Sequence, residues 1–191
     1  MEQCGFSEAA AKEIEARYHE HYKHSDDWVQ DKIIEASKKG YVEVAFGLRL
    51  RTPLLARTVI GKDYTPYAAQ KEARTAGNAL GQSYCMLNNR AALEFMTRVK
   101  ASPHRLKIKL IGLIHDAIYL LVKDEIEVVH WVNENLPDCM AWQGLPEIDH
   151  PVVKLSGALD IFYPSWANEI GLPNHATKPQ IRKIFQEALA A

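Results

Sequence analysis

The chain has 191 residues, 47% of them hydrophobic and 25% charged, and a formal net charge of −1. This composition excludes a disordered chain, and the balanced charge excludes a general attraction to phosphate, so any nucleic-acid surface must be local. No apolar run approaches the roughly 18 residues of a membrane span, and the first 30 residues are too charged for a signal peptide. We therefore expect a cytoplasmic protein with no membrane partner.

Two consecutive helices are predicted near the start of the chain. Ser7 can cap the first, in which apolar and aromatic residues recur every four positions from Ile14 to Tyr22. Ser25, followed by two aspartates, suggests the start of the second, and Gly40 suits its C-terminal cap.

Residues 41–51 alternate around Phe46-Gly47, which predicts a β-hairpin with Arg49 and Arg51 on one face. Two arginines that point the same way suit a phosphate backbone. The alternative is a solvated basic face, because these arginines belong to a local cluster of six basic residues. The cluster consists of Lys38, Lys39, Arg49, Arg51, Arg57 and Lys62.

From Tyr67 to about Lys100 the composition is helical, with an interruption predicted near Asn88-Asn89. Within this stretch Arg74, Asn78 and Gln82 stand four residues apart, which places three hydrogen-bonding side chains on one helix face. Such side chains can contact the minor-groove acceptors that all base pairs share, so this face can hold duplex DNA without selecting a sequence.

Small residues form a second stripe on the same predicted helix, at Ala73, Gly77 and Gly81. Each glycine inside a helix costs about 1 kcal/mol relative to alanine, so both indicate that something bulky approaches the backbone. Close packing against another helix of the protein explains the glycines equally well. It does not explain the adjacent polar stripe.

The segment 106–122 contains two apolar, β-branched runs that meet at His115-Asp116. A carboxylate is costly in an apolar setting, so Asp116 requires an explanation. One possibility is a hairpin whose tip lies in water. The other is a tight turn that holds Asp116 rigidly as an oxygen ligand for a divalent metal.

Beyond the hairpin, a helix is predicted from Asp124 to Leu136, where Pro137 would end it. Residues 152–162 supply a strand that could pair beside the hairpin. Pro179 opens an amphipathic helix, so residues 166–191 are interpreted as a C-terminal extension.

Three motifs, taken in order, resemble the C-terminal part of family A DNA polymerases, the DNA polymerase I-like group that includes bacteriophage replicative enzymes. The first is Gly40-Tyr41-Val42-Glu43 with Gly47-Leu48-Arg49-Leu50 and Pro53. The second is Glu72-Ala73-Arg74 with Asn78 and Gln82, which is similar to the family's primer–template helix. The third is Ile114-His115-Asp116-Ala117, at the place of the family's V-H-D-E motif.

The resemblance covers about residues 1–165 and implies an α+β fold: an antiparallel palm-type sheet with helices packed on one face, plus a DNA-facing β-hairpin. It implies DNA-directed DNA polymerase activity, with primer–template DNA and dNTP as partners. Arg74, Asn78 and Gln82 would contact the primer–template, and His115 would lie near the primer terminus. Asp116 would be the motif C ligand of two catalytic Mg2+ ions.

Two departures from the family pattern limit this expectation. Ala117 replaces the second acid of motif C, and we find neither the motif A strand with its aspartate nor the fingers helix. One aspartate cannot hold two magnesium ions. We therefore expect the chain to be inactive alone and to need a partner chain, or a missing segment, that carries motif A and the fingers.

Two other interpretations remain open. A non-catalytic DNA-binding or structural subunit derived from the same fold would explain Ala117. A small metal hydrolase that uses His115 and Asp116 is the third. Location in a bacterial host cytoplasm is expected if a phage encodes the protein.

Overall fold

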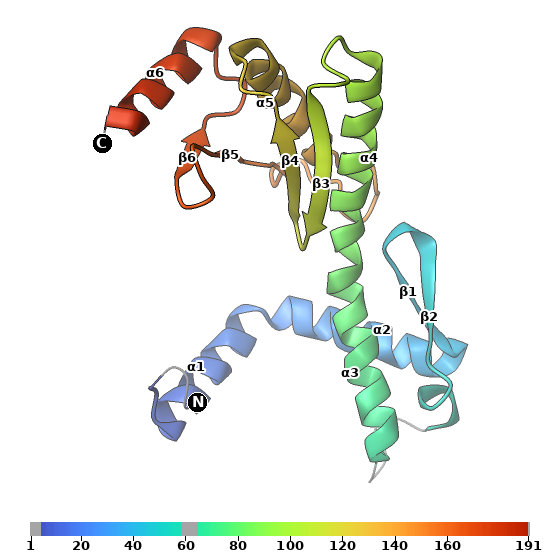
Figure 1. Cartoon of the computed structure of the whole chain (residues 1–191). Coiled ribbons are helices and arrows are strands. Elements are labelled where there is room, and N and C mark those ends of the chain that lie inside the picture. Colours follow the sequence, from blue (N-terminus) through green and yellow to red (C-terminus); the bar gives the residue numbers. More distant parts are fainter. Residues whose placement is uncertain (1–4, 59–64, 191) are drawn as a thin grey trace. The chain divides into compact units, whose positions relative to one another are not determined.

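The computed structural model describes residues 5–58 and 65–190 and has an α+β fold, as predicted (Figure 1). The chain divides into two compact units, residues 1–84 and 85–191. The first unit contains α1 (Glu8–His21), α2 (Lys23–Lys39), β1 (Tyr41–Val44), β2 (Leu48–Arg51) and α3 (Tyr67–Gln82). The second contains α4 (Met86–Ala101), β3 (Ile108–Ile114), β4 (Ala117–Val122), α5 (Ile126–Met140), β5 (Leu159–Phe162), β6 (Glu169–Leu172) and α6 (Lys178–Ala190).

Local sequence signals set the ends of the first two helices. The Ser7 hydroxyl accepts a hydrogen bond from the Ala10 backbone N–H at 3.3 Å and caps α1. Gly40, in the left-handed conformation with φ 77°, ends α2. The predicted start at Ser25 is wrong, because α2 already begins at Lys23. None of the residues of α1 is buried.

The β1–β2 hairpin is confirmed and packs with α2 and α3. Tyr41 lies opposite Arg51 and Glu43 opposite Arg49, so both arginines share one face. The other face turns inward, because Val42 is buried. The buried core of this unit comprises Ile33, Ala36, Val42, Leu55, Ala69, Ala76 and Leu80.

The helical stretch after residue 67 is interrupted earlier than the sequence indicated. A short 3-10 turn, Ser83–Cys85, separates α3 from α4. The predicted break at Asn88-Asn89 is therefore wrong, and Asn88 lies in the first turn of α4.

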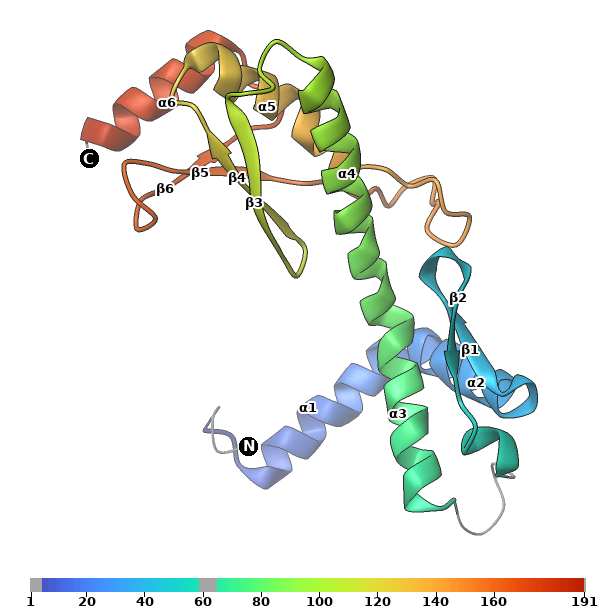
Figure 2. The same cartoon turned by 45° about the vertical axis from the view of Figure 1, so that its right-hand side comes forward.

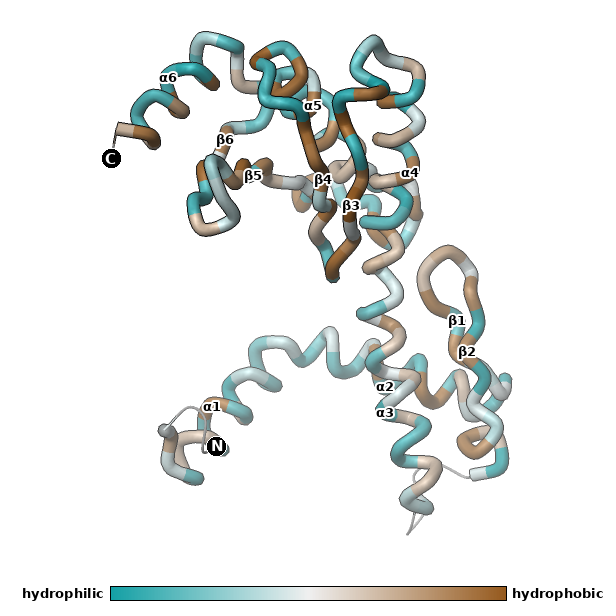
Figure 3. The backbone as a smooth tube through the Cα atoms, in the orientation of Figure 1, coloured by the Kyte–Doolittle hydropathy of each residue, from teal (hydrophilic) through white to brown (hydrophobic). Residues whose placement is uncertain are grey.

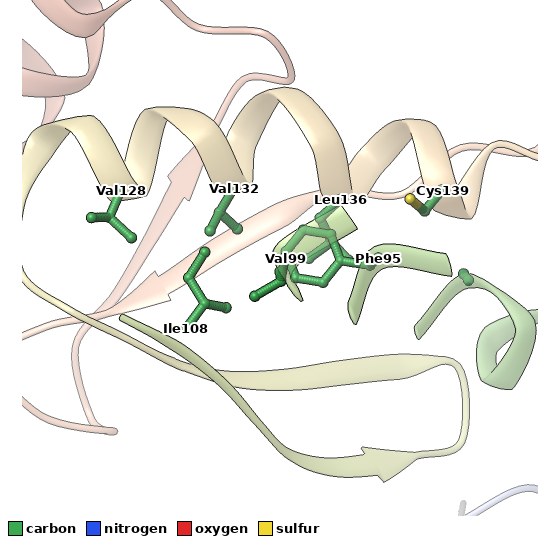
Figure 4. Packing of buried hydrophobic residues seen from close by; sticks show 8 residues of the cluster. Phe95, Val99, Ile108, Val128, Val132, Leu136 and Cys139 are labelled. Carbon is green, nitrogen blue, oxygen red and sulfur yellow. The ribbon is translucent and has the colours of Figure 1, made fainter. Parts of the chain in front are cut away.

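The core of the second unit forms between α4, α5 and the β3–β4 hairpin, so helices cover one face of this sheet, as predicted (Figure 4). Phe95 and Val99 from α4 meet Val128 and Val132 from α5, with Ile108 of β3 beside them. These five side chains are at most 3% exposed. The burial of their apolar surface is the main force that holds the hairpin on the helices.

Two expectations about the elements after the hairpin are wrong. Pro137 does not end the helix, because α5 continues to Met140 with Pro137 inside it. Of residues 152–162, which were expected to form one strand, only β5 (Leu159–Phe162) is a strand, and it pairs with β6 rather than with β3 or β4.

Helix α6 docks on α5 within the second unit (Figure 2). Ile181 is buried beside Leu172 and Ala176, and Ile126 and Val129 of α5 pack against this cluster. The interpretation of residues 166–191 as a separate C-terminal extension stays a prediction. Among the described helices, none is long and apolar enough to cross a membrane.

Candidate nucleic-acid interface and metal-binding turn

The polar stripe of α3 lies on the solvent side of the helix. Arg74, Asn78 and Gln82 are all exposed, whereas Ala76 and Leu80 face the core. Within residues 5–58 and 65–190, none of the three polar side chains makes a hydrogen bond or an ion pair. Their donors and acceptors are therefore directed to solvent, which is the state required of a surface that binds another molecule.

The two glycines of α3 have different surroundings. A Cβ atom at Gly77 would lie 3.4 Å from Cγ1 of Val29, so close packing against α2 accounts for this glycine. A Cβ atom at Gly81 would meet no described atom within 4 Å. Internal packing therefore explains Gly77 and leaves Gly81 unexplained.

The arginines of the β1–β2 hairpin are exposed, but Arg49 has partners inside the protein. Its Nε lies 3.4 Å from the Glu43 carboxylate, and its guanidinium lies 4.6 Å from the centre of the Tyr41 ring. Arg51 is exposed on the same face. Both pairings of Arg49 are at the surface and weak, so they orient the side chain without preventing a phosphate contact.

Other members of the predicted basic cluster differ in their surroundings. Lys39 forms an ion pair with Glu35, and this pair lowers the pKa of Glu35 and raises that of Lys39. Lys62 lies outside the described residues, as does Asp63. The basic cluster is therefore partly compensated by neighbouring carboxylates.

His115 and Asp116 form the two-residue connection between β3 and β4, and both are exposed. Ile114 and Ala117 lie opposite each other and close the turn. His115 has φ 53°, a left-handed conformation that is uncommon for a residue with a side chain. Because Asp116 lies in solvent, the burial cost expected from its apolar neighbours does not arise.

Asp116 alone does not complete a magnesium site. Ala117 offers no oxygen ligand, and in the described part of the chain no group of three or more His, Cys, Asp or Glu side chains could hold a metal ion. Asp116 is a hard oxygen donor of the kind that Mg2+ prefers, but a site would need further ligands. Two further aspartates that could offer a carboxylate, Asp124 and Asp160, lie after β4 and in β5.

Charged residues join the two ends of the hairpin at its base. Lys107 precedes β3 and Lys123 follows β4, and the Nζ atoms of both lie 2.5 Å from the Glu125 carboxylate. Hydrogen bonds from both ammonium groups lower the pKa of Glu125 to about 2. The carboxylate therefore bridges the two ends of the hairpin, which the backbone hydrogen bond from Lys123 N–H to the Lys107 carbonyl oxygen at 2.8 Å also joins.

Sequence reasoning missed one residue at the turn. Asn88 of α4 is 6% exposed and donates hydrogen bonds from Nδ2 to the carbonyl oxygens of His115 and Ala117. The sequence did contain a signal for this residue, because Asn88 is polar and lies on the same helix face as the apolar residues Ala91, Ala92 and Phe95. The polar stripe of α3 belongs to the first unit, whereas the turn at His115 and Asp116 belongs to the second.

The fold is similar to part of a solved polymerase domain. The structure is similar to the POL domain of Pol1 from M. smegmatis in complex with DNA primer-template and dNTP, with a TM-score of 0.55 and 22% sequence identity. The similarity covers 72% of this chain and 24% of that chain, so this chain spans about a quarter of the length of its structural relative. No curated protein matches the sequence significantly.

The family model that describes DNA polymerase family A matches residues 1–156. This range is most of the chain, and the chain belongs to that family.

Proposed function

We propose that this chain is the C-terminal palm and DNA-binding portion of a DNA-directed DNA polymerase, which binds primer–template and dNTP together with the rest of the enzyme. The observation that carries the proposal is the exposed, unpaired polar stripe of α3 in a member of this polymerase family. The matched structure contains primer-template and dNTP, which supports these ligands as candidates.

The α3 face would contact the minor groove of the duplex through Arg74, Asn78 and Gln82. Donors that reach the acceptors shared by all base pairs bind DNA irrespective of sequence, as a replicating enzyme requires. Gly81 leaves the helix backbone accessible beside Gln82, so a duplex could approach closely. Arg49 and Arg51 would add phosphate contacts from the β1–β2 hairpin.

Asp116 would serve as a magnesium ligand, and His115 would lie near the primer terminus. Bound magnesium ions supply a more acidic primer 3′-hydroxyl and stabilise the charge of the leaving pyrophosphate. This chain would contribute one carboxylate on a turn held by the hairpin. The remaining ligands would come from a chain or segment that carries motif A and the fingers.

The β3–β4 hairpin also favours such a partner. Ile111, Ile114 and Leu121 are 62%, 55% and 60% exposed, and hydrophobic residues run along both strands (Figure 3). The hairpin forms a two-stranded sheet in the described structure. Two strands with a large exposed apolar surface are rarely sufficient for a stable sheet, so pairing with a further strand would bury what is now exposed.

The alternative is a non-catalytic DNA-binding subunit, which Ala117 and the single carboxylate at the turn favour. Both proposals require duplex binding by α3. Fluorescence anisotropy of labelled primer–template should show weaker binding by Arg74→Ala at every DNA sequence and a smaller salt dependence of the dissociation constant. Arg17→Ala is the control, because Arg17 is an exposed helical arginine paired with Glu13. Equal effects of the two variants would contradict the α3 interface.

Catalysis separates the two proposals. The partner should co-purify with this chain from its native extract, where mass spectrometry can identify it. Primer extension by the assembled enzyme with Mg2+ should be lost in Asp116→Ala and retained in Asp124→Ala, whose carboxylate is also exposed. Full activity of Asp116→Ala would establish the non-catalytic alternative. Magnesium-dependent nuclease or phosphatase activity of the isolated chain would instead support the hydrolase interpretation.

A further inference from the structure

Asn88 forms a bridge across the turn that carries Asp116. Its Nδ2 atom lies 3.1 Å from the carbonyl oxygen of Ala117 and 3.4 Å from that of His115. These two carbonyls belong to the residues on either side of Asp116. Asn88 itself is fixed in the first turn of α4, whose next turns are anchored in the core through Phe95.

The chemistry of the contacts determines the orientation of the Asn88 amide. Both neighbours are carbonyl oxygens, so only the NH2 group can face them. The Oδ1 atom is buried and accepts no hydrogen bond from the described residues. A buried amide with one half unpaired is less favourable than an apolar side chain of similar size. Stability alone therefore does not explain an asparagine at this position.

The turn needs restraint from outside the hairpin. His115 has φ 53° at the first position of a two-residue connection, where glycine or asparagine is normally found. Such a conformation persists only where the surroundings hold it. The adjoining Leu113 and Ile114 are 39% and 55% exposed, so strand packing gives little support at the tip. In the described chain, Asn88 is the one side chain that hydrogen-bonds this turn.

We propose that Asn88 is a positioning residue, which fixes the direction of the Asp116 carboxylate by holding the carbonyls of His115 and Ala117. This inference rests on the proposed function, in which Asp116 is a metal ligand. A single carboxylate on a two-residue turn is useful as a ligand only if its position is constant, because Mg2+ demands near-ideal octahedral geometry. Asn88 would supply that constancy without touching substrate or metal.

The first test measures the turn in the full chain without any partner. Asn88→Leu keeps the branched shape and the number of heavy atoms of the side chain and removes the donor, and Asn89→Leu at the adjacent exposed position is the control. Amide hydrogen exchange by NMR should be about tenfold faster at Ile114 and Ala117 in Asn88→Leu, which corresponds to the loss of ordinary hydrogen bonds. The urea midpoint should be unchanged or higher, because a half-paired amide has been replaced by an apolar group.

This combination distinguishes positioning from a purely structural role. If Asn88 only stabilised the fold, the urea midpoint would fall and exchange would accelerate throughout α4 and α5. The proposal would be overturned if amide exchange at Ile114 and Ala117 were unchanged in Asn88→Leu. It would also be overturned if this exchange accelerated only in proportion to a lowered urea midpoint.

The second test uses primer extension by the assembled enzyme. Asn88→Leu should raise the Mg2+ concentration for half-maximal extension by about tenfold, as expected for loss of a group that orients a metal ligand, with unchanged affinity for primer–template. Loss of extension in Asp116→Ala, with a normal magnesium response in Asn88→Leu, would overturn the positioning role and leave the proposed function intact. Full extension in Asp116→Ala would overturn the metal-ligand role and, with it, the purpose assigned to the bridge.

Discussion

Replacement of Asn133 by alanine should detach the C-terminal segment from α5. Asn133 is fully buried, at 0% exposure. Its Nδ2 donates to the carbonyl oxygen of Pro173 at 2.9 Å, and its Oδ1 accepts from the backbone N–H of Ala176 at 2.7 Å. It therefore joins α5 to the loop between β6 and α6.

The expected loss of stability follows from the surroundings of these two groups. Ala176 is buried, and its N–H would lose its bond of 2.7 Å to Asn133 and keep only the longer one, of 3.3 Å, to the Pro173 carbonyl oxygen, at a cost of about 1–2 kcal/mol. Pro173 is exposed, so water can replace the lost bond and the cost is about 1 kcal/mol or less. The total is about 1–3 kcal/mol, a large part of the stability of a small unit.

Urea unfolding followed by circular dichroism measures this loss, and limited trypsin digestion at Arg182 and Lys183 reports detachment of α6. Asn135→Ala is the matched control on the same helix, since among residues 5–58 and 65–190 the Asn135 side chain bonds only to the Trp131 carbonyl oxygen, at 2.9 Å. The control should change stability by less than about 1 kcal/mol. A loss below about 0.5 kcal/mol in Asn133→Ala, with α6 still resistant to trypsin, would refute the reasoning.

Three further predictions concern other parts of the chain. Two lysines lower the pKa of Glu125 from its ordinary 4.5 to about 2. The ionised carboxylate therefore stabilises the fold above pH 4.5, and this stabilisation is lost as the pH falls to about 2. The urea midpoint of Glu125→Gln should vary less over this pH range than that of the wild type. Gly81→Ala should raise stability by about 1 kcal/mol and weaken primer–template binding, and unchanged anisotropy would argue against close approach of DNA to α3. Burial raises the pKa of the Cys139 thiol, so peptide mapping after iodoacetamide treatment should find exposed Cys85 alkylated well before Cys139.

The sequence by itself determined the elements whose signals are local. The cap at Ser7, the terminating Gly40 and the alternation across 41–51 each act over a few residues, and the structure has the helix, its end and the hairpin where these signals predict them. The four-residue spacing of the α3 stripe likewise determined that its polar side chains share a face. The family followed from three motifs in order, and the family match to residues 1–156 confirms it.

Only the tertiary structure decided matters that depend on what lies beside a residue. Pro137 stays helical and β5 pairs with β6, because packing outweighs propensity and a strand has no intrinsic preference for its partner. The two glycines of α3 look alike in the sequence, yet only Gly77 lies against Val29.

The turn at Asp116 shows the same division. The two apolar runs determined that a hairpin would form and which residue would lie at its tip. The contact from Asn88 arises because α4 packs against the hairpin and brings together residues separated by 27 and 29 positions. No local pattern encodes a hydrogen bond over that separation, since it exists only after the apolar core has formed.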